Sequence, residues 1–138
     1  MKIYKCLSYF CNLEFKKCYC VTKRYGDWND CSYLLRKPWK LATFNNIHDF
    51  DKVISRIQYL HYERMWVGCT DFISKGKLRW IGSSILPVNA TFMYEDGGPR
   101  CVYTCYYYRL CITNCHRSNI FKLLCSINIE DILNVLKL

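Results

Sequence analysis

Apolar residues recur at intervals of three and four along residues 45–60. Ile47, Phe50, Ile54 and Ile57 fall on one side of such a helix, and polar residues fall on the other. Asp49 lies in the first turn, where the helix dipole favours a negative charge. This pattern predicts an amphipathic helix from Asn45 to Leu60.

The rest of the pattern predicts short strands and two smaller helices. Strands are expected at 19–21, 65–69 and 78–81, as a pair within 101–115, and at 120–127. A short helix is expected between Asp27–Asp30, which offer helix caps, and Pro38. Ile129, Ile132, Leu133 and Leu136 predict a small amphipathic helix at the end, whereas 82–99 is typical of a long loop. Helices and an antiparallel sheet of short strands indicate an α+β fold.

The chain has 138 residues and contains neither an internal repeat nor a linker, which predicts one domain over 1–138. We expect a core at about 6–127 and an amphipathic tail at 128–138. A net charge of +9 admits acidic partners, but the basic residues are scattered and the longest runs are Lys16-Lys17 and Lys23-Arg24. Nucleic acid is therefore not an expected partner.

Eleven cysteines are the strongest compositional signal. This density is typical of disulfide-stapled extracellular domains, and no C-x-x-C pair indicates a metal site. The first residues form a poor signal peptide, and no apolar run reaches the roughly 18–20 residues of a membrane span. We expect an extracellular, cell-surface or virion-surface domain whose anchor is not visible in this chain.

A set of short segments occurs in a fixed order along the chain: Lys17-Cys18-Tyr19, Cys31, Trp39–Thr43 with Asp49-Phe50, Trp66–Cys69, Gly76–Trp80, and the cysteines 101, 115 and 125. Their order resembles the C-type lectin-like domain family, particularly its natural-killer-receptor type. The resemblance implies two helices, a short antiparallel sheet and a long loop, held together by disulfides. It also implies that the domain recognises a ligand and is not an enzyme.

The resemblance further implies three disulfides. It pairs Cys31 with Cys125, Cys101 with Cys115, and Cys6 with Cys18, although Cys11 and Cys20 compete for the third bond.

A fourth disulfide follows from the numbering of the predicted hairpin. Residues that face each other across an antiparallel hairpin have a constant sum of numbers, and both Cys101 with Cys115 and Cys105 with Cys111 give 216. If the turn has no bulge, Cys105 faces Cys111 and the two form a disulfide. The odd count then leaves at least one cysteine without a partner in the chain. It is either a buried Cys69 or an amino-terminal cysteine that joins two chains as a homodimer.

Calcium-dependent sugar binding in this family uses E-P-N or Q-P-D in the long loop, followed by W-N-D. The loop here has Ile85-Leu86-Pro87-Val88-Asn89, and Gly98-Pro99-Arg100 precedes Cys101. Trp28-Asn29-Asp30 spells W-N-D before the first helix, and we interpret it as a helix cap. We therefore expect neither a metal nor another cofactor. The three histidines are isolated, so no catalytic set is expected.

Two surface features remain as candidate sites. Asn89 begins the single N-x-[ST] sequon and is a predicted glycosylation site. The hairpin tip Tyr106, Tyr107, Tyr108 and Arg109 is the predicted ligand-binding site, because tyrosine and arginine are common binding hot spots.

We therefore predict calcium-independent binding of a protein ligand, such as a host immune receptor, by a receptor-like domain. Binding of acidic or sulfated glycans is the alternative. Frequent Lys, Asn, Ile and Tyr also fit an AT-rich coding genome, as large DNA viruses often have, which would make the chain a viral mimic.

Overall fold

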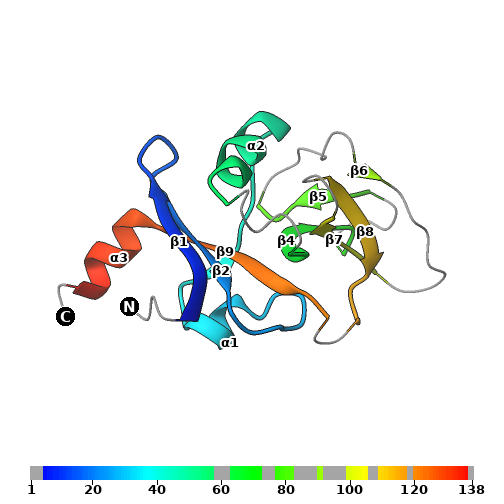
Figure 1. Cartoon of the computed structure of the whole chain (residues 1–138), viewed down its shortest axis with the longest axis horizontal. Helices are drawn as coiled ribbons and strands as arrows, with labels where there is room; N and C mark the ends of the chain where they lie inside the picture. Colours follow the sequence, from blue (N-terminus) through cyan, green and yellow to red (C-terminus); the bar gives the residue numbers. More distant parts are fainter. Residues whose placement is uncertain are drawn as a thin grey trace.

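The computed structural model describes residues 5–57, 63–72, 77–82, 90–91, 99–105, 109–117 and 120–136. Its centre is a mixed sheet in the order β1-β2-β9-β4-β7-β8-β6 (Figure 1). These strands are β1 (Cys6–Asn12), β2 (Lys17–Thr22), β9 (Lys122–Asn128), β4 (Met65–Thr70), β7 (Arg100–Thr104), β8 (Leu110–Asn114) and β6 (Ala90–Thr91). Two further short strands pair with inner strands of this sheet, β3 (Lys40–Leu41) with β9 and β5 (Arg79–Trp80) with β4. The β4–β9 and β6–β8 pairs are parallel, and the other pairs are antiparallel.

The central strands are buried on both faces. Successive side chains of a strand point to opposite faces, and each face packs on a hydrophobic cluster of its own. Tyr19 and Val21 of β2 belong to one hydrophobic cluster, whereas Cys18 and Cys20 belong to the other. The first cluster also holds the buried residues of α2 (Ile47–Ser55), and the second holds those of α1 (Cys31–Leu35). Figure 1 shows these two helices on opposite sides of β1, β2 and β9.

Helix α2 is shorter than the sequence pattern predicts. Asn46 begins it, since its side-chain oxygen accepts a hydrogen bond of 2.9 Å from the Asp49 N–H. The helix ends at Ser55, and the N–H groups of Arg56 and Ile57 bond to carbonyls only three residues back. Residues 58–60 of the predicted helix lie outside the described residues.

The predicted cap before α1 is present. Asp30 is the N-cap residue of the helix, but its carboxylate makes no hydrogen bond to the helix N–H groups. The carboxylate accepts the Asp27 N–H at 2.9 Å and thus closes the turn before the helix.

Helix α3 (Ile129–Leu136) follows β9 directly. Ile129 and Ile132 pack on the cluster that contains α1, and the Ile129 N–H donates to the Lys16 carbonyl at 3.0 Å. Leu133 on the same helix is half exposed. Within the described part of the chain, no helix has the length and apolar character needed to span a bilayer.

Candidate recognition site

The hairpin of β7 and β8 carries the predicted tip. Tyr106, Tyr107 and Tyr108 lie outside the described residues, whereas Arg109 is described and exposed. The Cys105 N–H donates to the Arg109 carbonyl at 2.8 Å, and the Cys105 sulfur lies 3.3 Å from the same oxygen. A disulfide between Cys105 and Cys111 closes the hairpin immediately below the tip. Both ends of the tip are therefore fixed to each other.

The register of this hairpin corrects the sequence arithmetic. Cys101 faces Thr113 and Tyr103 faces Cys111, so the numbers of facing residues add up to 214 rather than 216. The Cys101–Cys115 and Cys105–Cys111 disulfides therefore join diagonal neighbours, not facing residues. A shift of two residues preserves the alternation of faces, which is why both bonds still form on one side of the hairpin.

Strand β6 extends the same edge of the sheet. Ala90 pairs with Leu110 and Thr91 pairs with Cys111, so the last two residues of the sequon lie beside the base of the tip. Asn89, the predicted glycosylation site, lies outside the described residues. A glycan at this position would be attached one residue from the strand that flanks Arg109.

Asp71 joins the two ends of the long segment between β4 and β7. Its carboxylate accepts the Arg100 N–H at 2.7 Å, and its own N–H donates to the Arg100 carbonyl at 3.1 Å. The Thr70 hydroxyl donates to this carbonyl at 2.7 Å. Asp71 is buried, and its bonds to Arg100 are part-buried. They hold the end of β4 to the start of β7.

Replacing Asp71 with alanine should lower the free energy of unfolding by about 1–3 kcal/mol, because the part-buried Arg100 N–H loses its acceptor. Asp71→Asn keeps an oxygen acceptor and should recover part of that loss. Urea unfolding followed by tryptophan fluorescence measures both variants. An Asp71→Ala variant as stable as the parent would show that the carboxylate contributes nothing to holding the segment.

The amino-terminal disulfides differ from the expected pairing. Cys6 bonds to Cys20 and Cys11 bonds to Cys18, so the Cys6–Cys18 pair is wrong. The reason is the β1–β2 hairpin, in which Cys11 lies directly opposite Cys18. Cys6 pairs with Thr22 at the other end of the hairpin and reaches Cys20 diagonally. The sequence pattern did not predict strand β1, and without it the four cysteines could not be ordered.

The long-range disulfide joins Cys31 of α1 to Cys125 of β9, with 5.8 Å between their Cα atoms. This is the pairing that the resemblance implies. Cys125 also lies opposite Cys20 across the β2–β9 pair, so two disulfides meet at the centre of the sheet.

Cys69 is the one cysteine without a disulfide, and all eleven cysteines are among the described residues. It lies in β4 with no exposed surface, and burial raises the pKa of its thiol to about 12. A homodimer joined through an unpaired cysteine does not fit this arrangement, because the free sulfur is inside the fold.

Cys69 should not react with iodoacetamide at pH 8 while the protein is folded. Its thiolate fraction is on the order of 1000-fold below that of a thiol with an ordinary pKa near 9, and burial also blocks access. In guanidinium chloride without reductant, one alkylation per chain is expected by intact-mass spectrometry. Labelling of the native protein, or of two or more cysteines after unfolding, would contradict the assignment.

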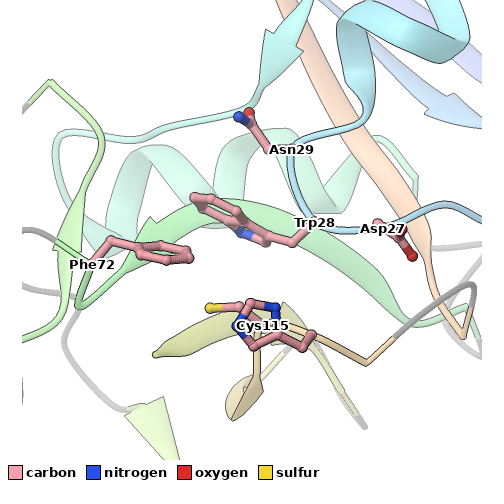
Figure 2. A pocket seen from close by; sticks show the side chains of 6 residues that line it. Asp27, Trp28, Asn29, Phe72 and Cys115 are labelled. Atoms are coloured by element: carbon pink, nitrogen blue, oxygen red, sulfur yellow. The ribbon is translucent and has the colours of Figure 1, made fainter. Parts of the chain in front are cut away.

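The structure also forms a pocket that the sequence did not predict. It has a volume of about 370 Å³ and is lined by Asp27, Trp28, Asn29, Phe72, Cys115 and His116 (Figure 2). The rings of Trp28 and Phe72 lie 5.5 Å apart, although 43 residues separate them along the chain and no sequence spacing links them.

The side chains of segment 82–99 and of β8 do not offer the set of oxygen ligands that a calcium ion takes. Calcium takes six to eight oxygen ligands. Segment 82–99 contains two carboxylates, Glu95 and Asp96, and β8 offers Cys111, which is in a disulfide, and the buried Ile112 and Thr113. In the described part of the chain, no three His, Cys, Asp or Glu side chains gather as a metal site.

The chain has the C-type lectin-like fold. It is similar to the human scavenger receptor C-type lectin carbohydrate-recognition domain, with 16% identity and a TM-score of 0.64 over 87% of this chain and 95% of that one. The mouse scavenger receptor C-type lectin carbohydrate-recognition domain is 18% identical, with a TM-score of 0.66 over 87% of this chain and 93% of that one. The C-type lectin domain of murine dendritic cell inhibitory receptor 2, solved in complex with N-glycan, is 16% identical, with a TM-score of 0.63 over 88% of this chain and 97% of that one.

No family model and no curated protein matches the sequence. At these identities the solved structures establish the α+β architecture of a C-type lectin-like domain, with its few helices and several disulfides.

Proposed function

We propose that this domain binds a protein ligand outside the cell, without calcium and without catalysing a reaction, through the hairpin tip at Tyr106–Arg109. The observation that carries the proposal is the closure of this tip by the Cys105–Cys111 disulfide and by the Cys105 N–H bond to Arg109. A loop whose two ends are held together before binding has less conformational entropy to lose when it meets a partner.

The chemistry of the tip supports a protein ligand. Three tyrosines and an arginine combine large contact surfaces with hydrogen-bond donors, and this combination is enriched in binding hot spots. Arg109 is exposed directly before the first residue of β8, and its guanidinium group suits an acidic group on the partner.

The five disulfides support the extracellular location in this proposal. Ten of the eleven cysteines form five disulfides, and such bonds persist in oxidising environments. A secreted or surface-exposed domain is the setting in which this scaffold is stable.

The test is a binding screen of the tetramerised domain against an array of extracellular proteins, run once with calcium and once with EDTA. Arg109→Ala and Tyr107→Ala should each weaken binding to the ligand found by about tenfold or more. Arg24→Ala and Tyr33→Ala are the matched controls, because both side chains are exposed and lie on other elements, and they should bind like the parent.

Two results would contradict the proposal. One is binding that disappears in EDTA, and the other is binding that the tip variants leave unchanged. The glycan alternative is tested by adding sulfated polysaccharides to the array, since binding to them should fall steeply between low and moderate salt.

A further inference from the structure

We propose that the pocket between Trp28 and Phe72 binds a neutral pyranose sugar by direct contact, without a metal. Three elements form it: the segment between β2 and α1, the residue pair that follows β4, and Cys115-His116 after β8. It lies at the end of the β7–β8 hairpin away from Arg109, so it is separate from the tip and does not depend on the proposed function.

The apolar part of the pocket consists of two aromatic rings. Trp28 and Phe72 are tilted by 34° with their centroids 5.5 Å apart, and Figure 2 shows both side chains reaching the same space. The indole Nε1–H of Trp28 donates to the Val67 carbonyl at 3.0 Å. The indole therefore has no polar atom left for a ligand, and its remaining surface suits carbon-bound hydrogens such as those of a sugar ring.

The polar part of the pocket both donates and accepts hydrogen bonds. The Asp27 carboxylate supplies acceptors, whereas the Asn29 amide and the His116 ring each supply a donor and an acceptor. Sugar hydroxyls do the same, since each both donates and accepts. Among the described residues that line the pocket there is neither a lysine nor an arginine, so they offer a sulfated or carboxylated sugar no such counter-charge.

Four of the lining residues are held in place by bonds of their own. Beside the Trp28 bond to Val67, the Asp27 N–H bonds to the Asp30 carboxylate and the His116 N–H bonds to the Asn114 side chain at 2.8 Å. Cys115 is held by its disulfide to Cys101. The volume of about 370 Å³ lies in the range of small-ligand sites and accommodates one sugar ring.

The experiment is an NMR titration of the 15N-labelled 16.6 kDa domain in EDTA. The probes are the methyl glycosides of glucose, galactose, mannose and N-acetylglucosamine, with tetramethylammonium chloride and glucose 6-sulfate as competing ligand classes. At least one glycoside should shift the Trp28 indole and Phe72 amide signals saturably at millimolar concentration, as expected for a small ligand in an open pocket.

Phe72→Ala should weaken this binding by about tenfold, because Phe72 is half exposed and its loss removes one wall of the pocket without removing core packing. His116→Ala tests the polar rim in the same way, and Tyr33→Ala and Arg109→Ala should leave the titration unchanged. An unchanged titration in Arg109→Ala also separates this site from the hairpin tip.

Three results would overturn the proposal. The first is the absence of saturable shifts up to about 100 mM of every glycoside. The second is a set of shifts that Phe72→Ala leaves intact. The third is tighter binding of tetramethylammonium or of the sulfated sugar than of each neutral glycoside, which would assign the pocket to a cation or an anion instead.

Discussion

A variant with Cys31 and Cys125 both replaced by alanine should lose about 4–5 kcal/mol of unfolding free energy, because this bond closes the longest loop in the chain, with a sequence separation of 94. The loss follows from the unfolded state, which gains the conformational freedom that the cross-link removes. Since whole domains are stable by about 5–15 kcal/mol, the variant should be close to unfolding at room temperature. Guanidinium chloride unfolding without reductant measures the change.

The matched control is the double alanine variant of Cys105 and Cys111, whose separation is 6. The same relation gives a loss of about 2 kcal/mol for so short a loop. Equal losses in the two variants, or a larger loss in the control, would mean that Cys31–Cys125 does not act as the long-range constraint of the fold.

Trp66→Ala should cost about 3–5 kcal/mol, the range for removing a fully buried aromatic side chain. Trp66 has no exposed surface, and its ring lies 4.8 Å from that of Phe121 and 6.2 Å from that of Tyr103. Its Nε1–H also donates to the Gly26 carbonyl at 3.2 Å, so truncation both opens a cavity and leaves this oxygen without its donor.

Trp66→Phe separates these two effects, because it retains most of the ring and loses only the hydrogen bond. Its cost should fall between those of the parent and of Trp66→Ala, whereas Tyr33→Ala, at a side chain that is 78% exposed, should change stability by less than about 0.5 kcal/mol. Urea unfolding monitored by far-UV circular dichroism gives all three values. A Trp66→Ala variant within about 1 kcal/mol of the parent would contradict the packing described for this side of the sheet.

Apolar patterning alone predicted the elements with a clear buried face. The helix at 47–55 repeats apolar residues at helical spacing, and the strand at 65–70 is a continuous run that is buried at every position. Strand β1 was missed because its burial pattern is weak, with Ser8 as its one fully buried residue. A strand at the edge of a sheet buries little, so its sequence carries little signal.

The pairing of the cysteines shows the same limit. Cys31–Cys125 and Cys101–Cys115 follow from a resemblance over widely spaced residues, whereas the four amino-terminal cysteines require the register of the β1–β2 hairpin. The hairpin arithmetic gave the correct partners for Cys105 from a register that is two residues off, because diagonal and facing positions share a face.

The candidate sites divide in a similar way. The tip at Tyr106–Arg109 was predicted because its residues are consecutive in the sequence and typical of binding surfaces. The pocket of Trp28 and Phe72 was not, because it depends on contacts between three segments that only the folded chain brings together.

The most direct test of a disulfide-held lectin-like scaffold is a peptide map of the unreduced protein by mass spectrometry. We expect cross-linked peptides that join Cys31 to Cys125, Cys6 to Cys20, Cys11 to Cys18, Cys101 to Cys115 and Cys105 to Cys111, with Cys69 as a free thiol. A map in which Cys31 and Cys125 are free, or bonded to other partners, would contradict the architecture and the recognition role built on it.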